Sequence, residues 1–390
     1  MRDIEFRINL FSLTTKIRCI SESTFYLLIT PFILIIKLLL RKPSNNNKVL
    51  IIERILRIGD TITAMPAIDA IEGKFGRLNV YRLISDKMKA LVNVFDDGER
   101  KILWEKHNSF LSFMRQIMKI RMMNFSKAYL LVTDRMSAIF AMLTGISHTI
   151  GFDYNRRGIF LTESIKPPDF INRPAFAYKK NTEVHNIKNV WLNLIDRVTI
   201  SKSLIIKNKL ILNKEDILWV EKRIGYLKRP IVILHPTSAS TSKLWYKERW
   251  IELGKKLLLN GFSVVITAGV GEAGDPLEIS HTLKATCTIG ETSIPKLIAL
   301  INYADAVISL DTAIGHISAL LNKPSVVLFG SSDERIWKPD SRSVSIVMGK
   351  SNCIRCKKSK CFQKERYCMK SITVDIVLEV FFNTIKVNQQ

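Results

Sequence analysis

The chain has 390 residues, more than one hydrophobic core usually serves, so two domains are expected. Its formal net charge of +24 at pH 7 indicates an anionic partner, and nucleic acid, anionic lipid and a phosphorylated glycolipid all fit that charge. No nucleic-acid-binding motif is found and aromatic residues do not alternate with basic ones, which disfavours a nucleic-acid-binding protein. The first twenty residues mix charged and apolar side chains without the apolar core of a secretory signal, so a cytoplasmic protein is expected.

An apolar segment lies at residues 24–40, with the sequence TFYLLITPFILIIKLLL. It falls short of the roughly 20 residues that a spanning helix needs, it contains Pro31 and Lys37, and basic residues lie on both sides of it. We expect an anchor that lies in the membrane plane or re-enters it, held by apolar burial and by attraction to anionic lipid. A buried helix of the first domain and a single spanning helix are the alternatives. A polar linker follows at residues 43–47, so residues 1–47 are interpreted as a membrane-associated segment and linker.

Strands and helices alternate in the first half of the body. Strands are predicted at residues 49–52, 80–84 and 128–132, and helices at residues 62–75, 110–122, 136–144 and 184–198. This alternation predicts a parallel sheet covered by helices, in a first domain of residues 48–205.

A second α/β series follows and predicts a second domain of residues 206–371. Strands are predicted at residues 230–234, 262–267, 306–310 and 325–329, and helices at residues 213–224, 250–259, 294–303 and 315–321. Residues 372–390 carry a last helix, at residues 374–382, which is expected to pack back on the first domain.

Three short motifs carry the functional signal. Residues 309–316, Ser-Leu-Asp-Thr-Ala-Ile-Gly-His, follow an apolar strand and open a helix, where unpaired backbone N–H groups and the helix dipole favour an anion. Residues 57–60 read Arg-Ile-Gly-Asp, and His-Pro-Thr at residues 235–237 precedes Lys-Leu-Trp at residues 243–245. The first motif alone is weak, because many α/β proteins have a strand–Asp–Thr–helix turn.

Together these motifs resemble those of the heptosyltransferases, glycosyltransferase family nine, enzymes that build the bacterial lipopolysaccharide core. The resemblance covers roughly residues 48–380. It implies the GT-B architecture, two Rossmann-like domains that face a central cleft, with ligands in the cleft at the carboxyl ends of the strands.

Asp60 is the predicted general base. Glycosyl transfer to a hydroxyl needs a carboxylate that accepts the hydroxyl proton, and the resemblance assigns that role to this Asp. Gly59 is expected to let the chain turn sharply after the strand, and Arg57 and Gly59 are placed on the acceptor side of the turn. From the residues alone, Asp60 could instead be the N-cap of the following helix.

Lys243 is predicted to neutralise the nucleotide diphosphate as a point charge, although a solvated loop lysine is the alternative. The Lys-x-Trp then Glu-x-Trp pattern of the resembled family recurs here, at residues 243–245 and 248–250. Thr237 and Ser238 are predicted to hydrogen-bond the same phosphates; a local bond within the turn is their alternative.

The turn at Asp311 and Thr312 is expected to hold the diphosphate and the sugar, with Asp311 on the sugar hydroxyls. Ala313 and Gly315 are predicted donor contacts, although many family members have Gly and a larger residue at these places. His316 is interpreted as a structural residue of the helix start rather than a catalyst.

Glu272 ends the turn Gly-Val-Gly-Glu at residues 269–272 and is similar in place to a family acid thought to hold the nucleoside end of the donor. The Gly-x-Gly of this turn lacks the full dinucleotide-binding fingerprint and follows a late strand, which disfavours a NAD-dependent enzyme.

Four of the six cysteines lie in one basic stretch near the C-terminus. Four thiolates could hold a structural zinc ion, whereas reduced or disulfide-paired thiols are the alternative. These cysteines are Cys353, Cys356, Cys361 and Cys368.

The resemblance implies an inverting glycosyltransferase that needs no metal cofactor and moves heptose from ADP-heptose to a glycolipid acceptor at the cytoplasmic face of the inner membrane. Another nucleotide sugar is the nearest rival donor. A membrane-bound binding protein that kept the fold but lost catalysis is the rival from a different class.

Overall fold

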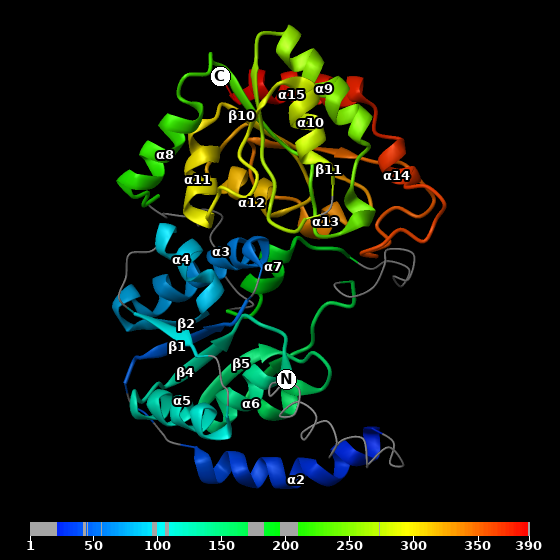
Figure 1. Cartoon of the computed structure of the whole chain (residues 1–390). Coiled ribbons are helices and arrows are strands. Elements are labelled where there is room, and N and C mark those ends of the chain that lie inside the picture. The colour runs from blue at the N-terminus through cyan, green and yellow to red at the C-terminus, as the bar shows by residue number, and fades with distance from the viewer. Residues whose placement is uncertain are drawn as a thin grey trace.

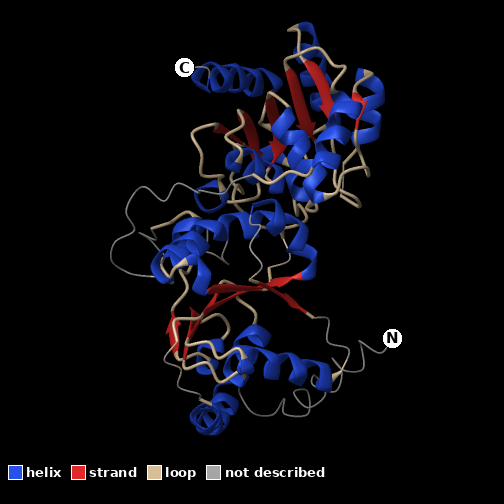
Figure 2. Ribbon diagram, turned by 90° about the vertical axis from the view of Figure 1, so that its left-hand side faces the viewer, coloured by secondary structure: helices blue, strands red, loops and turns tan. Residues whose placement is uncertain are grey.

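The computed structural model describes residues 22–41, 44, 46–55, 57–95, 100–105, 109–170, 183–195, 210–272 and 274–388. These residues form two lobes, each built around one six-stranded sheet (Figure 1). Helices cover both faces of the sheets, as Figure 2 shows. The predicted boundary between domains, at residues 205 and 206, falls outside the described residues.

The first sheet has the strand order β3-β2-β1-β4-β5-β6, and every pairing is parallel. The central strand β1 is buried along its whole length, because both faces of the sheet are covered. The strands are β1 (Val49–Glu53), β2 (Val80–Ser85), β3 (Lys101–Trp104), β4 (Lys127–Leu130), β5 (His148–Phe152) and β6 (Glu163–Ile165). The helices of this lobe are α2 (Glu22–Leu40), α3 (Ile58–Phe75), α4 (Lys89–Phe95), α5 (Phe110–Met122), α6 (Arg135–Leu143) and α7 (Ile187–Leu192), with short 3₁₀ turns η1 (Arg77–Asn79), η2 (Asp86–Met88) and η3 (Arg157–Phe160).

The second sheet has the strand order β12-β11-β10-β7-β8-β9 and is also parallel throughout. Its strands are β7 (Ile231–His235), β8 (Ser263–Ile266), β9 (Thr286–Cys287), β10 (Ala306–Leu310), β11 (Ser325–Phe329) and β12 (Val344–Met348). Its helices are α8 (Lys214–Ile224), α9 (Lys247–Leu259), α10 (Pro276–Leu283), α11 (Ile294–Tyr303), α12 (Ala313–Leu320), α13 (Glu334–Trp337), α14 (Tyr367–Lys370) and α15 (Val374–Asn388), with the 3₁₀ turn η5 (Thr241–Lys243).

The last helix corrects one prediction. Residues 374–382 were expected to pack on the first domain, but α15 packs on β11, β12 and α9 of the second lobe. The buried side chains of Val377 and Phe381 join the apolar core of the second sheet, and Lys256 of α9 pairs with Asp375 at 2.6 Å. This helix therefore covers one face of the second sheet.

An apolar core also joins the two lobes. Helices α3 and α4 pack against α12 and α11, and buried side chains of both lobes share one cluster, among them Ile62, Leu91, Ile298 and Ile314. This packing fixes the start of α3 against the start of α12, where two of the three sequence motifs lie.

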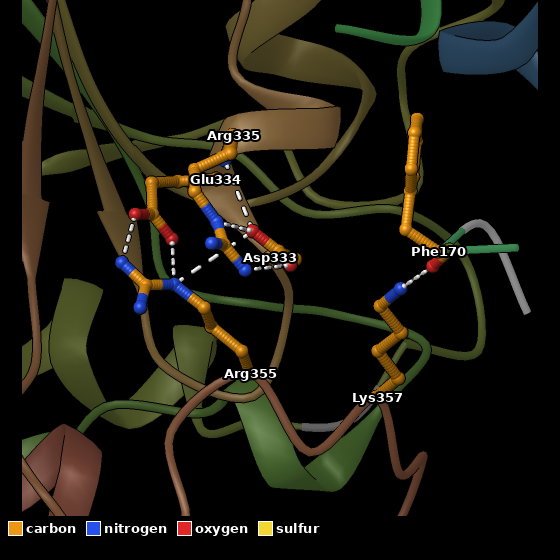
Figure 3. A network of polar contacts seen from close by, with 6 residues as sticks. All are labelled: Phe170, Asp333, Glu334, Arg335, Arg355 and Lys357. Atoms are coloured by element: carbon orange, nitrogen blue, oxygen red, sulfur yellow. Dashed lines mark hydrogen bonds and ion pairs between the residues drawn. The ribbon is translucent and has the colours of Figure 1, made fainter. Parts of the chain in front are cut away.

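A polar contact joins the lobes at a second place (Figure 3). The Lys357 ammonium donates to the Phe170 carbonyl, which belongs to the first lobe. Nearby, Arg355 pairs with Glu334, and the fully buried Asp333 carboxylate accepts from Arg335 at 2.8 Å. The basic stretch of the C-terminal cysteines thus lies at the boundary between the lobes.

Helix α2 lies along the end of the first lobe that faces away from the second (Figure 1). One face of it is fixed to the lobe: Ile33 is buried, and the Lys37 ammonium donates to the carbonyls of Ile159 at 3.2 Å and Leu161 at 2.5 Å. The opposite face leaves apolar side chains exposed, so the alternative of a fully buried helix does not describe it. In the described part of the chain, no helix combines the length and the apolar character needed to cross a membrane.

Candidate active site

The first turn of α3 carries the Arg-Ile-Gly-Asp motif. The helix begins at Ile58, because Thr61 already donates its backbone N–H to the Arg57 carbonyl at 3.1 Å. Arg57 is the N-cap residue, so the alternative that Asp60 caps the helix is wrong. Asp60 stands inside the first turn, where a carboxylate is favoured by the helix dipole.

Gly59 serves close packing rather than the sharp turn predicted for it. It lies within the helix and, unlike the turn glycines, does not have a positive φ. A Cβ at this residue would lie 3.2 Å from Cδ2 of His316 and 3.9 Å from the Cα of Ala313. The missing side chain therefore lets the first turn of α3 approach the first turn of α12 across the two lobes.

The Asp60 carboxyl lies within electrostatic reach of groups from both lobes. Burial raises its pKa above the ordinary value; the charges of Arg57 and Lys243 oppose that rise, and the charge of Asp311 adds to it. The structure thus brings the predicted base together with the predicted donor turn. A raised carboxyl pKa strengthens the carboxylate as a proton acceptor.

Lys243 and Asp311 form an ion pair that the sequence did not indicate. The Lys243 ammonium, at the end of η5, donates to Oδ2 of Asp311 at 2.6 Å and to the Asp311 carbonyl at 3.0 Å. The side chains are 26% and 9% exposed, so Lys243 is not the solvated loop lysine of the alternative. An ammonium has three N–H donors, and this arrangement uses two of them.

The start of α12 has the features of an anion site. Thr312 is its N-cap, yet its side chain makes no capping hydrogen bond. The buried Oγ1 of Thr312 has no hydrogen-bond partner among the described residues. Ala313 lies at the face turned to Gly59, whereas a Cβ on Gly315 would lie 2.9 Å from Val327, toward β11. The sheet packing explains that glycine, and a donor contact through its backbone stays a prediction.

His316 is buried between the lobes, as its position beside Gly59 requires. Burial lowers the pKa of its imidazole to about 4; the Asp311 charge raises it and the Lys243 charge lowers it. A neutral ring packed against a glycine fits the structural role predicted for this histidine.

A second polar cluster surrounds Glu272, after β8. Its Oε2 accepts from the Thr237 hydroxyl at 2.7 Å and from the Gly269 N–H at 2.9 Å, and lies 3.3 Å from Nε2 of His235. Burial raises the pKa of Glu272, but the hydrogen bond and charge of His235, with the bonds from Thr237 and Gly269, outweigh burial and bring it to about 2. Glu272 is therefore a fixed anion at neutral pH.

This cluster changes the interpretation of two residues. The Thr237 hydroxyl donates its proton to Glu272, so in this structure that proton is not available to a phosphate. The Ser238 hydroxyl accepts from the Ser240 N–H at 3.1 Å, which is the local turn bond of the alternative. Both side chains are buried in the turn that precedes Lys243, and the phosphate contact expected of these two residues stays a prediction.

A pocket of about 440 Å³ opens beside Glu272 at the carboxyl end of β8. This is the edge where open α/β sheets bind ligands. Its lining residues are 268–272, 274–278, 289 and 290.

Two tryptophans support the Lys243 turn. Trp245 and Trp250 are buried and pack edge to face with ring centroids 5.1 Å apart, and the Trp245 indole donates to the Ile372 carbonyl at 3.0 Å. In the Lys-x-Trp pattern, the buried Trp245 therefore fixes the position of the turn that carries the Lys243 charge. His235 orients Glu272, a role that the His-Pro-Thr motif did not predict.

The C-terminal cysteines are free thiols where the structure describes them. Burial raises the pKa of Cys368 to about 11, and Cys353, Cys356 and Cys361 act in the same direction. The other three thiols therefore lie within electrostatic reach of Cys368, yet no group of three or more potential metal ligands is formed within the described ranges. The predicted zinc site stays a prediction.

Comparison with known proteins agrees with this geometry. Residues 113–366 match the model of glycosyltransferase family 9 (heptosyltransferase). Lipopolysaccharide heptosyltransferase 3 of Escherichia coli K12 is 32% identical over 125 residues, which are 30% of this chain and 36% of that protein. The match thus spans about a third of the length of this curated relative.

Two solved structures share the fold. The ADP-heptose lipopolysaccharide heptosyltransferase II of E. coli has a TM-score of 0.67 at 17% identity, covering 88% of this chain and all of that one. The E. coli heptosyltransferase WaaC, solved with ADP, has a TM-score of 0.55 at 14% identity, covering 86% and 99%. The two lobes are therefore the GT-B fold expected from the sequence.

Proposed function

Because the chain belongs to glycosyltransferase family 9, we propose that it transfers a heptose from ADP-heptose to a lipopolysaccharide-core or similar glycolipid acceptor. The observation that carries this proposal is the meeting of Asp60, from the first lobe, with the Lys243–Asp311 pair and the start of α12, from the second. A base for the acceptor and a cradle for the leaving diphosphate then lie on opposite sides of one reaction centre.

The proposed reaction is a single displacement with inversion. The acceptor hydroxyl gives its proton to the Asp60 carboxylate while its oxygen forms a bond to the anomeric carbon of the sugar. The bond from that carbon to the diphosphate oxygen breaks, and ADP leaves with the electron pair. Attack from the side opposite the diphosphate inverts the anomeric carbon.

Positive charge for the leaving group comes from the chain itself in this proposal. We assign the phosphate oxygens to three groups of donors: the third N–H of Lys243, the Thr312 hydroxyl and the backbone N–H groups at the start of α12. The mechanism therefore requires no metal ion. Asp311, held by Lys243, is assigned to the sugar hydroxyls, since a carboxylate repels phosphate.

The pocket beside Glu272 is assigned to the adenosine end of the donor. Glu272 is ionised and held by three donors, so its second oxygen can accept from ribose hydroxyls. The ADP bound to WaaC supports an adenine nucleotide as the donor class. Another nucleotide sugar is the rival for this pocket.

We further propose that the chain works at the cytoplasmic face of the inner membrane, attached peripherally through residues 24–40. Support comes from α2, whose outer face exposes Phe32, Ile35 and Leu39 while Lys37 holds the inner face to the lobe. The net charge of +24 favours an anionic membrane and a phosphorylated acceptor.

A donor screen tests the proposed function. Thermal shift of the full chain with ADP, UDP and GDP and with their sugars should show selective stabilisation by ADP and ADP-heptose. Stabilisation by UDP or GDP compounds alone would assign another donor to the same fold. Release of ADP from ADP-heptose that depends on an acceptor glycolipid then distinguishes a transferase from a binding protein.

A further inference from the structure

A stripe of exposed apolar side chains runs along the outer face of α2. Phe32, Ile35, Ile36 and Leu39 follow one another at helical spacing, and Leu39 is 77% exposed. Single exposed apolar residues are ordinary on a protein surface, but a continuous stripe marks a face that binds something.

Helix α5 carries a second exposed stripe, made of three apolar side chains and one arginine. Leu111, Arg115, Met118 and Met122 lie at positions i, i+4, i+7 and i+11, which is one face of a helix. Leu111 and Met122 are 75% and 78% exposed, whereas Ile120 on the opposite face is fully buried. The capping box at Ser109 fixes where this helix begins.

The two helices meet at their C-terminal ends. The Arg121 guanidinium of α5 donates to the Leu40 carbonyl of α2 at 2.8 Å and lies 3.4 Å from the Thr144 carbonyl. The exposed residues Leu39 and Met122 are the neighbours in sequence of the two partners, Leu40 and Arg121. Figure 1 shows both helices at the end of the first lobe away from the second lobe. The Arg121 contacts therefore hold the C-terminal ends of the two helices, and with them the ends of the two stripes, close together.

The charge of this surface is basic. Arg41 and Arg115 are exposed, and the Lys119 side chain is 60% exposed, with only a weak contact to Glu105 at 3.8 Å. Helix α5 contains no acidic residue. Basic side chains beside an apolar stripe match the phosphates and acyl chains of an anionic bilayer.

We propose that α2 and α5 together form one membrane-docking surface that lies on an anionic phospholipid bilayer. This inference rests on the proposed attachment through α2 and adds α5 as a second contact, which fixes the orientation of the first lobe. With this face on the bilayer, the second lobe and its donor pocket point into the cytoplasm.

Vesicle flotation of the full chain tests the proposal, with phosphatidylcholine vesicles that contain or lack phosphatidylglycerol. The variant Leu111→Gln/Met118→Gln/Met122→Gln should bind anionic vesicles at least about tenfold more weakly, because apolar burial is lost at three side chains. Arg115→Gln/Lys119→Gln should lose about tenfold of its affinity for the anionic vesicles alone. The matched control Leu218→Gln/Leu259→Gln removes exposed apolar residues of the second lobe and should change nothing.

Three further readouts separate the possible failures. Thermal stabilisation by ADP should be unchanged in the α5 variants, which shows that they fold and keep the donor site. Relative to the unsubstituted chain, which has six tryptophans, Met118→Trp should add indole fluorescence that brominated lipids quench, whereas the fluorescence that Leu218→Trp adds should not be quenched. Phe32→Gln/Leu39→Gln tests the attachment through α2 itself.

Unchanged vesicle binding of the α5 variants, with binding lost in the α2 variant, would overturn the role of α5 and leave the attachment standing. A loss of self-association by the α5 variants, in place of vesicle binding, would also overturn it, since the surface would then pair two copies of the chain.

Discussion

The Lys243–Asp311 pair allows the sharpest single perturbation of the site, Lys243→Gln. Breaking a fully buried pair costs about 3–5 kcal/mol and an exposed pair under about 1 kcal/mol. The Asp311 side chain is 9% exposed and that of Lys243 is 26% exposed, so the structure places the loss between these limits, at about 2 kcal/mol. For one lobe of this chain that loss is a fall in Tm of roughly 4–8 °C.

The same substitution should act on catalysis in two ways. Removal of a charge that offsets the leaving diphosphate should lower kcat by about 10²–10³. The Lys243 charge also opposes the rise in the pKa of Asp60, so its removal should raise that pKa further. Because Asp60 must be ionised to accept a proton, the acid limb of the kcat/KM profile should then move to higher pH.

Steady-state release of ADP over a pH series measures both effects, and Lys243→Arg serves as the matched control. The arginine keeps the positive charge, so the acid limb of that variant should stay near its original pH. If Lys243→Gln left kcat within about threefold of the unsubstituted chain, with the acid limb in place, the assignment of Lys243 to the leaving group would be refuted.

Two further substitutions test the donor cluster and the approach of the lobes. Glu272→Gln should weaken ADP binding by about tenfold or more and should remove the stabilisation that the lowered carboxyl pKa provides. That stabilisation is about 3 kcal/mol; it is fully present above the ordinary carboxyl pKa and is lost as the pH falls toward 2. The Tm difference between the variant and the unsubstituted chain should therefore shrink as the pH is lowered through this window. A Tm difference independent of pH would contradict the hydrogen bonds and charge assigned to Glu272. Gly59→Val should lower kcat/KM by at least about tenfold, because the new side chain collides with His316 and moves the Asp60 turn away from the donor site. The affinity for ADP should be unchanged, because the donor site itself is not altered. Gly59→Ala is the milder control, since a single methyl group at 3.2 Å needs only a small shift and alanine favours the helix; equal losses in both variants would argue against a steric cause.

The sequence predicted the main elements well where strands are buried and helices are amphipathic. The bounds of α5, α11, β10 and β11 agree with the prediction. Strands such as β5, with Thr149 and Gly151, and β6, with Glu163 and Ser164, are short and partly polar, so no apolar run marks them. The packing of α15 could not be predicted either, because the apolar face of a helix does not determine which of two sheets the helix covers.

The sequence indicated residues of the candidate site but not the contacts between them. The three motifs indicated Asp60, Lys243 and Asp311, and the structure brings them together. The pairing of Lys243 with Asp311 joins residues 68 positions apart and depends on the order β10-β7 in the sheet, which the chain order does not give. Gly59 was assigned to a turn because glycine after a strand usually makes one, whereas here a histidine from the other lobe requires the small residue.

The most direct test of the central proposal compares Asp60→Asn with the unsubstituted chain, using ADP-heptose and an acceptor glycolipid. Asparagine keeps the shape of the side chain but cannot accept the proton, so turnover should fall by about 10²–10⁴ while ADP binding and Tm stay close to their original values. If Asp60→Asn turned over at a rate close to that of the unsubstituted chain, the carboxylate would not be the base, and the proposed mechanism would be wrong.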